Sequence, residues 1–263
     1  MSETAALAHV VLPTAQWAEE DGTMTNLEGR VIRRNRAVKP PEGVRTDLQI
    51  IKGIANGLGS GRSFSVRPKA VFEELRQATA GAAADYSGIT YDRIQEEGGV
   101  FWPCPGEEHP GTPRMFLYRF ATPDGRAQFH PVAFQGAAEP VDETYPLYLT
   151  TGRVMSQYQS GTQTRRVDSL NYASPDAFVE MHPTIAKRHG ISDGATVLVR
   201  TRRGEAAARA RLTSSIRPDT IFVPFHWGGS QRANLLTNPA LDPSSRMPEF
   251  KVCAAQIEPA ELP

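Results

Sequence analysis

Six short β-prone runs follow one another after about Pro140, and this spacing constrains the fold more than any other feature of the sequence. Each run is four to seven residues long and rich in Val, Ile, Leu, Phe or Ala, and turn residues separate neighbouring runs. Short strands at this spacing are typical of a small closed β-barrel. The expected strands are Leu147–Thr151, Phe178–Met181, Thr196–Thr201, Ala206–Leu212, Ile221–Phe225 and Val252–Ile257.

Two local signals support this interpretation. The segment Arg202-Arg203-Gly204-Glu205 between the third and fourth runs is a plausible hairpin connection. One short helix is expected between the second and third runs, with His182 as its cap, Pro183 in the first position and Gly190 at its end. The second part of the chain, residues 141–263, can therefore bury a core of its own.

Residues 1–140 contain fewer regular elements. Ala8–Leu12 reads as a buried strand, and the polar stretch 19–36 contains a turn at Asp21-Gly22. Helices are expected from a cap at Thr46-Asp47 to Leu58, and from Pro68 to just before Gly81. Residues 59–63 read as a flexible connection.

A long segment without periodicity occupies residues 86–134. Its stretch 98–116, GGVFWPCPGEEHPGTPRMF, is too rich in Pro and Gly for a long helix or a central strand. We expect an ordered loop there, because Phe101, Trp102 and Phe116 would otherwise face water. One strand is too little sheet to cover the two helices, so we expect this part to need partners outside the chain.

Composition excludes several classes of protein. The chain has 29 basic and 29 acidic residues, and this zero net charge argues against a nucleic-acid-binding protein. No apolar run is long enough to span a bilayer, and the first residues lack the positive region of a secretory signal. Cys104 and Cys253 could form one disulfide, but two reduced thiols in a cytoplasmic protein is the simpler expectation. Two cysteines alone cannot hold a structural zinc or an iron–sulfur cluster.

The sequence contains no self-contained catalytic centre. Its six His residues show no metal-ligand spacing, and the HExxH, G-x-S-x-G and P-loop motifs are absent. The Gly-rich run Gly57–Gly61 follows a helix rather than a strand, which is the wrong context for a dinucleotide fingerprint.

Polar residues after two of the expected strands are candidates for ligand binding. The run from Thr150 to Thr162 combines hydroxyl groups with Arg153, which suits phosphate oxygens, although most polar loops bind nothing. The segment Pro224–Gly229 contains Phe225, His226 and Trp227, for which core packing and a capping His are the ordinary alternatives. Asn234 could read a flat heterocycle or simply cap a turn, and Lys251 could be a surface charge.

Six stretches together resemble one family. They are VVLPTAQWAEEDGTMTNLEGR, FWPCPGEEHPGTPRMF, FATPDGRAQF, YPLYLTTGRVMSQYQSGTQTRR, MHPTIAKRHGISDGATVLVRTRRG and FVPFHWGGSQRANLLTNPALDPSSRMPEFKVCA. The chain resembles the C-terminal part of a molybdopterin oxidoreductase of the bis-guanine-dinucleotide type. It is most similar to nitrate reductase catalytic subunits of the assimilatory and periplasmic branch.

The resemblance implies an α/β fragment over residues 1–140 and a mainly-β domain over 141–263, a six-stranded double-psi β-barrel that binds Mo-bis(molybdopterin guanine dinucleotide). It implies reduction of nitrate to nitrite by oxygen-atom transfer at molybdenum. Phe225 would lie near the substrate. The implied cofactor-binding residues are Thr151, Gly152, Arg153, Val154, Met155, Ser156, Gln157, Tyr158, Gln159, Ser160, Asn234 and Lys251.

Two departures from the family pattern limit these expectations. Family members are longer, and the cysteines for their [4Fe-4S] cluster and the side chain that reaches molybdenum have no counterpart here; Cys104 and Cys253 do not match them. We therefore expect the missing N-terminal part of the same enzyme as a partner, and an isolated chain without activity. A formate dehydrogenase or another molybdopterin oxidoreductase, and a non-catalytic cofactor- or partner-binding barrel, remain alternatives.

Overall fold

The chain folds into two compact units. A computed structural model describes residues 2–60 and 64–260. The units comprise Met1–His130 and Pro131–Pro263. Most of the flexible connection expected at 59–63 lies outside the described residues.

The first unit contains helices around a three-stranded antiparallel sheet in the order β1-β2-β3. Its core forms where α3 and α4 meet this sheet, and it includes Val31, Phe72, Ile94 and Val100. The elements are α1 Glu3–Leu7, a 3-10 turn Trp17–Glu19, β1 Gly22–Thr25, β2 Arg30–Arg34, α2 Asp47–Gly57, α3 Pro68–Thr79, α4 Tyr91–Glu97 and β3 Val100–Phe101.

Both helices expected in this unit are confirmed. Thr46 caps α2: its hydroxyl accepts from the N–H of Gln49 at 3.3 Å, and the Gln49 side chain accepts from the N–H of Thr46 at 2.9 Å. Helix α3 begins at Pro68. Only Ala55 of α2 is buried, so its apolar face at Ile51 and Ile54 is half exposed.

Three expectations for this unit are wrong. Residues 8–12 form no strand, because no partner strand in the described chain pairs with them, and Val10 is exposed. No turn forms at Asp21-Gly22, since β1 begins at Gly22. The turn between β1 and β2 lies at Asn26–Gly29, where Asn26 Oδ1 accepts two backbone N–H bonds and Gly29 has φ +80°. Phe116 is half exposed, stacked only on the ring of Phe120.

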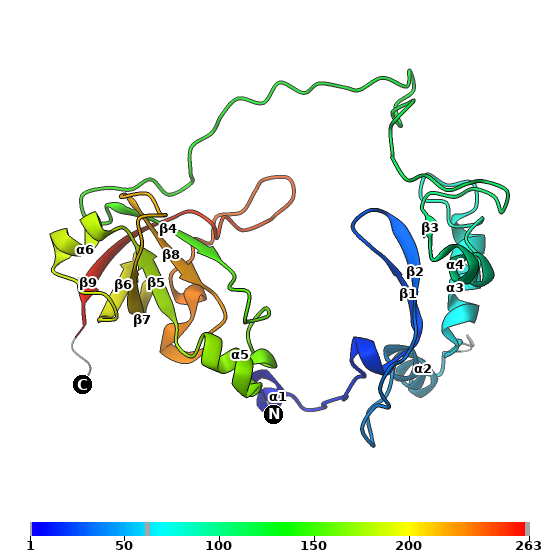
Figure 1. Cartoon of the computed structure of the whole chain (residues 1–263), viewed down its shortest axis with the longest axis horizontal. Helices are drawn as coiled ribbons and strands as arrows, with labels where there is room; N and C mark the ends of the chain where they lie inside the picture. Colours follow the sequence, from blue (N-terminus) through cyan, green and yellow to red (C-terminus); the bar gives the residue numbers. More distant parts are fainter. Residues whose placement is uncertain (1, 61–63, 261–263) are drawn as a thin grey trace. The chain divides into compact units, whose positions relative to one another are not determined.

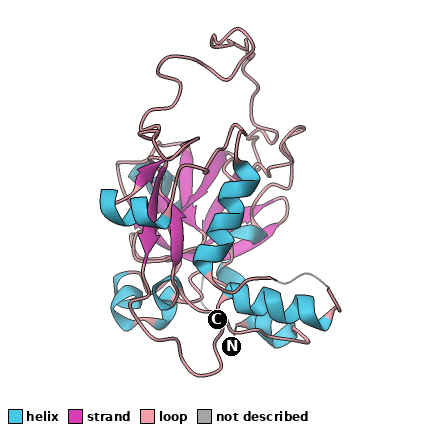
Figure 2. Cartoon of the chain, turned by 90° about the vertical axis from the view of Figure 1, so that its right-hand side faces the viewer, coloured by secondary structure: helices cyan, strands magenta, loops and turns pink. Residues whose placement is uncertain are grey.

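The stretch between β3 and β4 contains no helix or strand, as the composition of 98–116 predicts (Figure 2). Just before it, α4 forms inside a segment in which no periodicity was expected. Thr90 caps this helix, and Gly98 ends it with φ +68°.

The second unit is a closed six-stranded barrel in the order β4-β8-β5-β7-β6-β9 (Figure 1). The pairs β4–β8 and β5–β7 are parallel and the others antiparallel. All six expected strands are confirmed, as are the hairpin and the helix capped by His182. The elements are β4 Leu147–Gly152, α5 Asp168–Ala173, β5 Phe178–Met181, α6 Pro183–His189, β6 Thr196–Thr201, β7 Gly204–Leu212, β8 Thr220–Pro224 and β9 Cys253–Pro259, with 3-10 turns at Thr164–Arg166, Gly229–Gln231 and Ala233–Leu235.

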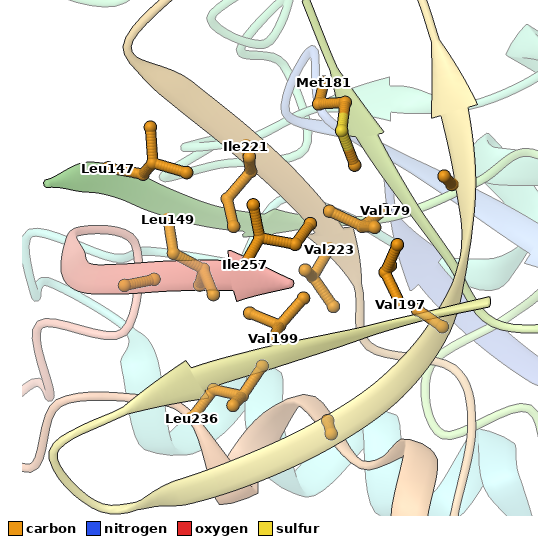
Figure 3. Packing of buried hydrophobic residues seen from close by; sticks show 14 of the residues in the cluster. Leu147, Leu149, Val179, Met181, Val197, Val199, Ile221, Val223, Leu236 and Ile257 are labelled. Carbon is orange, nitrogen blue, oxygen red and sulfur yellow. The ribbon is translucent and has the colours of Figure 1, made fainter. Parts of the chain in front are cut away.

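Alternate residues of the strands fill the barrel. Burial alternates along β4 and β6 because successive side chains point to opposite faces. The side chains of Leu149, Val199, Val223 and Ile257 point toward one another in the interior (Figure 3). Ile185 of α6 and Leu236 of the β8–β9 connection belong to the same core.

Strand direction decides which loops gather at each end. Because β4 and β8 are parallel neighbours, with Gly152 opposite Pro224, both finish at one end, which we call the loop end. Strand β9 is antiparallel to β4 and therefore begins there. Helix α6 connects the finish of β5 to the start of β6, so it lies at the opposite end.

Candidate functional site

The candidate residues all lie in segments that leave or enter strands at the loop end. Residues 153–160 follow β4, Phe225 and Asn234 follow β8, and Lys251 precedes β9. Sequence separation between these segments is large, and the pairing of β4 with β8 and β9 brings them to one end of the barrel.

Thr151 and Lys251 are directly bonded. Lys251 Nζ donates to the Thr151 carbonyl at 2.6 Å, and the buried Thr151 hydroxyl donates to the Phe250 carbonyl at 3.1 Å. The ammonium also lies 5.2 Å from the Phe250 ring centroid. The charge of Lys251 is thereby held beside the finish of β4, with donor capacity left for an anion.

Arg153 extends from the end of β4 into solvent. Its guanidinium carbon lies 5.6 Å from the ring centroid of Phe225, and its Nη2 donates a long bond of 3.5 Å to Gln159 Oε1. The structure therefore brings Arg153 and Phe225 together. A guanidinium with five donors and one weak partner is free to form the paired bonds that phosphate oxygens accept.

Gly152 and Gln157 are held by the protein itself. A Cβ on Gly152 would lie 2.5 Å from the Phe222 ring, so this position has no room for a side chain. The buried Gln157 side chain accepts from the Thr164 hydroxyl at 2.7 Å and donates toward the carbonyls of Leu170 and Ser174. The backbone N–H of Gln157 donates to the Val154 carbonyl at 3.2 Å, so this residue can offer a ligand only its own carbonyl.

The other residues of the segment divide by exposure. Val154 packs against the buried cluster of Ala177, Phe178 and Trp227. The exposed members are Met155, Tyr158, Gln159 and Ser160, and Ser156 is partly buried. The Ser160 hydroxyl shares a 2.9 Å hydrogen bond with that of Thr162. The exposed residues of this segment therefore include a hydroxyl group and a phenol.

Asn234 lies at the loop end but on the side of the β6–β7 turn. It is exposed on the 3-10 turn Ala233–Leu235, and Arg203 donates to the carbonyl of Leu236, the residue that follows this turn, at 2.9 and 3.1 Å. Among the described residues no hydrogen bond joins its amide to residues 151–160. Its amide is therefore available to a ligand that extends across the end of the barrel.

Sequence reasoning missed the importance of His226. The imidazole is fully buried; Nε2 accepts from the Val154 N–H at 2.9 Å, and Nδ1 lies 2.5 Å from the Gln159 carbonyl. The available signal was the strand exit PFHW, but its meaning depends on the pairing of β4 with β8.

Glu139 was also missed. It accepts from Arg202 at 2.7 Å, from Arg203 at 2.7 and 2.9 Å and from the Ala254 N–H at 3.0 Å. Burial alone would raise the pKa of Glu139, but these hydrogen bonds and the positive charge outweigh it and hold the pKa at about 2. The carboxylate is thus charged and ties the segment before β4 to the β6–β7 turn and to β9.

The two cysteines are free and buried, one in each unit. Cys253 Sγ accepts from the Asn238 N–H at 3.2 Å, and burial raises the pKa of its thiol. Within residues 2–60 and 64–260 no group of three or more His, Cys, Asp or Glu side chains is placed to hold a metal ion. No described helix has the length and hydrophobicity to cross a membrane.

Two family matches fall on this chain. Residues 147–254 match the Molydopterin dinucleotide binding domain, and residues 1–57 match the Molybdopterin oxidoreductase family. The first match runs from the start of β4 to the second residue of β9. It includes every candidate residue at the loop end. The chain belongs to the molybdopterin oxidoreductase family.

Curated relatives of this molybdopterin oxidoreductase chain include enzymes named for two substrates. The assimilatory nitrate reductase catalytic subunit of Bacillus subtilis is 45% identical over 262 residues, which are 98% of this chain and 37% of the relative. The F420-dependent formate dehydrogenase subunit alpha of Methanocaldococcus jannaschii is 43% identical over 98% of this chain and 38% of its own length. The periplasmic nitrate reductase of Desulfovibrio desulfuricans is 37% identical, with corresponding shares of 98% and 36%.

A solved structure shares the fold. Acetylene hydratase from Pelobacter acetylenicus superposes with a TM-score of 0.74 at 20% identity, over 98% of this chain and 39% of that one. The chain thus spans little more than a third of the length of these relatives.

Proposed function

We propose that the loop end of the barrel binds the molybdopterin guanine dinucleotide, and that the barrel is of the double-psi type. The observation that carries this proposal is the gathering of Arg153, Asn234 and Lys251 at one end of the matched domain. A dinucleotide carries a pyrophosphate, a guanine and a pterin. Arg153 and Lys251 supply charge for phosphate oxygens, and Asn234 supplies an amide for a heterocycle.

The remaining residues of 151–160 act through their exposed faces. Tyr158 and Ser160 offer hydroxyl groups, and Ser156 and Met155 line the same turn. Gly152 acts on the inner side, because the ring of Phe222 fills the space that a side chain there would need. The residues present therefore fit the cofactor by donor type. We assign residues 1–140 to the catalytic region and 141–263 to the dinucleotide-binding domain.

The reaction we propose is reduction of nitrate to nitrite, on the basis of the 45% identity with an assimilatory nitrate reductase. Molybdenum in the bound cofactor supplies the oxygen-atom transfer. The residues of this chain bind and orient the cofactor and exclude water from its buried parts. Phe225, partly buried beneath the Arg153 guanidinium, is the proposed residue nearest the substrate.

An iron–sulfur cluster does not fit the residues of this chain. A [4Fe-4S] cluster needs four ligands, usually thiolates, whereas the sequence has two cysteines, in different units. We therefore propose that the chain works with the remainder of a longer enzyme. Exposed apolar side chains support this, because Tyr118 and Phe129 are 96% exposed and Leu58 of the α2 end is 81% exposed.

Formate oxidation is the second candidate function. F420-dependent formate dehydrogenases are 40–43% identical to this chain over 98% of it, almost as similar as the nitrate reductase. The loop-end residues serve a cofactor that both activities would share, so the barrel does not discriminate between them.

The test is to produce the 263-residue chain in a host that synthesises the cofactor. Molybdenum, pterin and guanine would be measured per chain after purification, and nitrite formation and formate oxidation assayed. We expect cofactor to co-purify with the chain and neither activity to appear without the rest of the enzyme. Absence of molybdenum, pterin and guanine would contradict cofactor binding. Turnover by the isolated chain would contradict the need for a partner.

A further inference from the structure

His226 contacts the candidate segment at two points. It follows β8, one residue beyond Phe225, and it is fully buried. Nε2 accepts from the N–H of Val154 at 2.9 Å, and Nδ1 lies 2.5 Å from the carbonyl oxygen of Gln159. One ring therefore bonds two backbone groups five residues apart in the segment.

The chemistry of these two contacts fixes the form of the ring. A carbonyl oxygen can only accept, so Nδ1 must donate; a backbone N–H can only donate, so Nε2 must accept. The only form that satisfies both is the neutral imidazole with its proton on Nδ1. Removing the ring would leave the Val154 N–H and the Gln159 carbonyl without this partner.

The surrounding backbone is built around this contact. Gln159 has φ +49° and Gly161 φ +70°, both in the left-handed region. A Cβ on Gly161 would lie 2.5 Å from the His226 carbonyl oxygen, so the chain at 161 passes directly against the His226 backbone. The turn thus requires glycine at 161 and a fixed position of residue 226.

Two neighbouring rings also lie against His226. Its ring centroid lies 5.0 Å from that of Phe225 and 5.9 Å from that of Trp227. Trp227 is buried against Phe178, and its indole N–H donates to the Pro175 carbonyl at 3.4 Å. The imidazole is therefore anchored to β5 as well as to β8.

We propose that His226 is a positioning residue, which holds residues 154–159 in one conformation before any ligand arrives. It faces the interior, whereas Arg153 and Tyr158 face outward. A preorganised loop binds its ligand more tightly, because the conformational entropy of ordering the loop is already lost when the chain folds and not when the ligand binds. The inference rests on the proposed function only for what the segment binds; the ordering of the segment is a property of the chain itself.

Backbone hydrogen exchange of the full chain tests the ordering directly. His226→Phe keeps a ring of similar size and removes both nitrogens; the matched control Trp227→Phe removes the neighbouring indole donor and keeps both bonds to the segment. We expect exchange of the peptide covering 153–161 to rise about tenfold or more in His226→Phe. In Trp227→Phe it should stay near that of the parent.

A second variant covers the case in which His226→Phe does not fold. Asn places its amide nitrogen at the same distance from Cβ as Nδ1, so His226→Asn keeps the donor to Gln159 and loses the acceptor for Val154. The amide of Val154 should then exchange faster while the end near Gln159 stays protected. Unchanged exchange of the Val154 amide in His226→Asn would overturn the proposal.

Cofactor content separates this inference from the proposed function. In the expression experiment above, we expect His226→Phe to retain about a tenth of the parent's pterin and guanine, and Trp227→Phe to retain most of it. Faster exchange with undiminished cofactor would refute a role in binding. A parent chain without cofactor would count against the proposed function, and hydrogen exchange would still decide whether His226 orders the segment.

Discussion

Glu139 and Arg203 form a paired ionic contact, in which the two terminal nitrogens of Arg203 donate to the two carboxylate oxygens at 2.7 and 2.9 Å. The carboxylate also accepts the N–H of Ala254 at 3.0 Å. The partners come from the segment before β4, the β6–β7 turn and β9, so one charge joins three separate parts of the barrel unit.

Loss of this charge should make the barrel unit less stable in acid. The pKa of Glu139 is about 2 in the folded chain, below its usual value of 4.5. The contribution to stability is therefore present above about pH 4.5 and lost as the pH falls toward 2, and its full size is on the order of 3 kcal/mol. Urea unfolding of the chain at a series of pH values measures it.

Glu139→Gln is the control for this prediction. The variant should be less stable at pH 7, and its free energy of unfolding should change less between pH 4.5 and 2 than that of the parent. Parallel pH profiles for parent and variant would contradict the assignment, since other acidic groups are common to both.

Gly161→Ala should destabilise the chain more than Gly190→Ala. Both glycines have positive φ, +70° and +65°, so both substitutions cost about 1–2 kcal/mol of backbone strain. A Cβ at Gly190 meets open space, whereas at Gly161 it meets the His226 carbonyl at 2.5 Å. We expect Gly161→Ala to cost about 1–2 kcal/mol more, measured by urea unfolding. Equal losses in the two variants would show that the segment moves aside freely.

Arg153→Ala should reduce cofactor content with little effect on stability. Arg153 is exposed, and its contacts with Phe225 and Gln159 are long, so the chain loses less than about 1 kcal/mol on truncation. Arg188→Ala is the matched control, because Arg188 is an exposed arginine of α6 at the opposite end of the barrel. We expect molybdenum and guanine per chain to fall several-fold in Arg153→Ala and in Asn234→Ala, but not in the control. Full cofactor content in Arg153→Ala would remove that residue from the site.

Neither thiol should react in the folded chain. Cys104 and Cys253 are fully buried, and burial raises the pKa of the Cys253 thiol, so little reactive thiolate is available. Titration with a thiol reagent should detect neither thiol in the folded chain and both thiols after unfolding in guanidinium chloride. Rapid labelling of Cys253 under native conditions would mean that the loop end opens more readily than its packing suggests, and rapid labelling of Cys104 would mean the same of the core of the first unit.

The barrel could be predicted because its core is a pattern of alternate residues. Leu147, Leu149 and Thr151 face inward along β4 while their neighbours face outward, and the same period marks β6. Helix ends were also predictable where a capping side chain meets a terminal glycine, as at His182 and Gly190. In both cases a short stretch of sequence determines the structure.

The hairpin of β1 and β2 could not be predicted because charged side chains cover its faces. Arg30 lies over the Phe101 ring at 4.7 Å and Arg33 over the Tyr91 ring at 4.4 Å, so arginines occupy positions where a strand pattern calls for apolar residues. At Ala8–Leu12 the opposite error occurs: the apolar run predicts a strand that does not form. An apolar run forms a strand only where another strand is available to pair with it.

The two hydrogen bonds from His226 to Val154 and Gln159 could not be predicted from the sequence, for a different reason. Val154 and His226 are 72 residues apart, and they meet only because Gly152 and Pro224 are opposite each other in a parallel pair. Sequence pattern identified the strands but did not specify which of them are neighbours. The candidate segment could therefore be named, whereas the side chain that orders it could not.

The position of β9 has a consequence for how the chain is made. This last strand lies between β6 and β4 in the barrel, so five strands can emerge from the ribosome while the sheet still has two open edges. Unpaired edges invite pairing with other chains, and barrels remove that hazard only by closing. Closure of the barrel therefore has to wait until Cys253–Pro259 is free to pair, and a chain truncated before these residues would keep the open edges of β4 and β6.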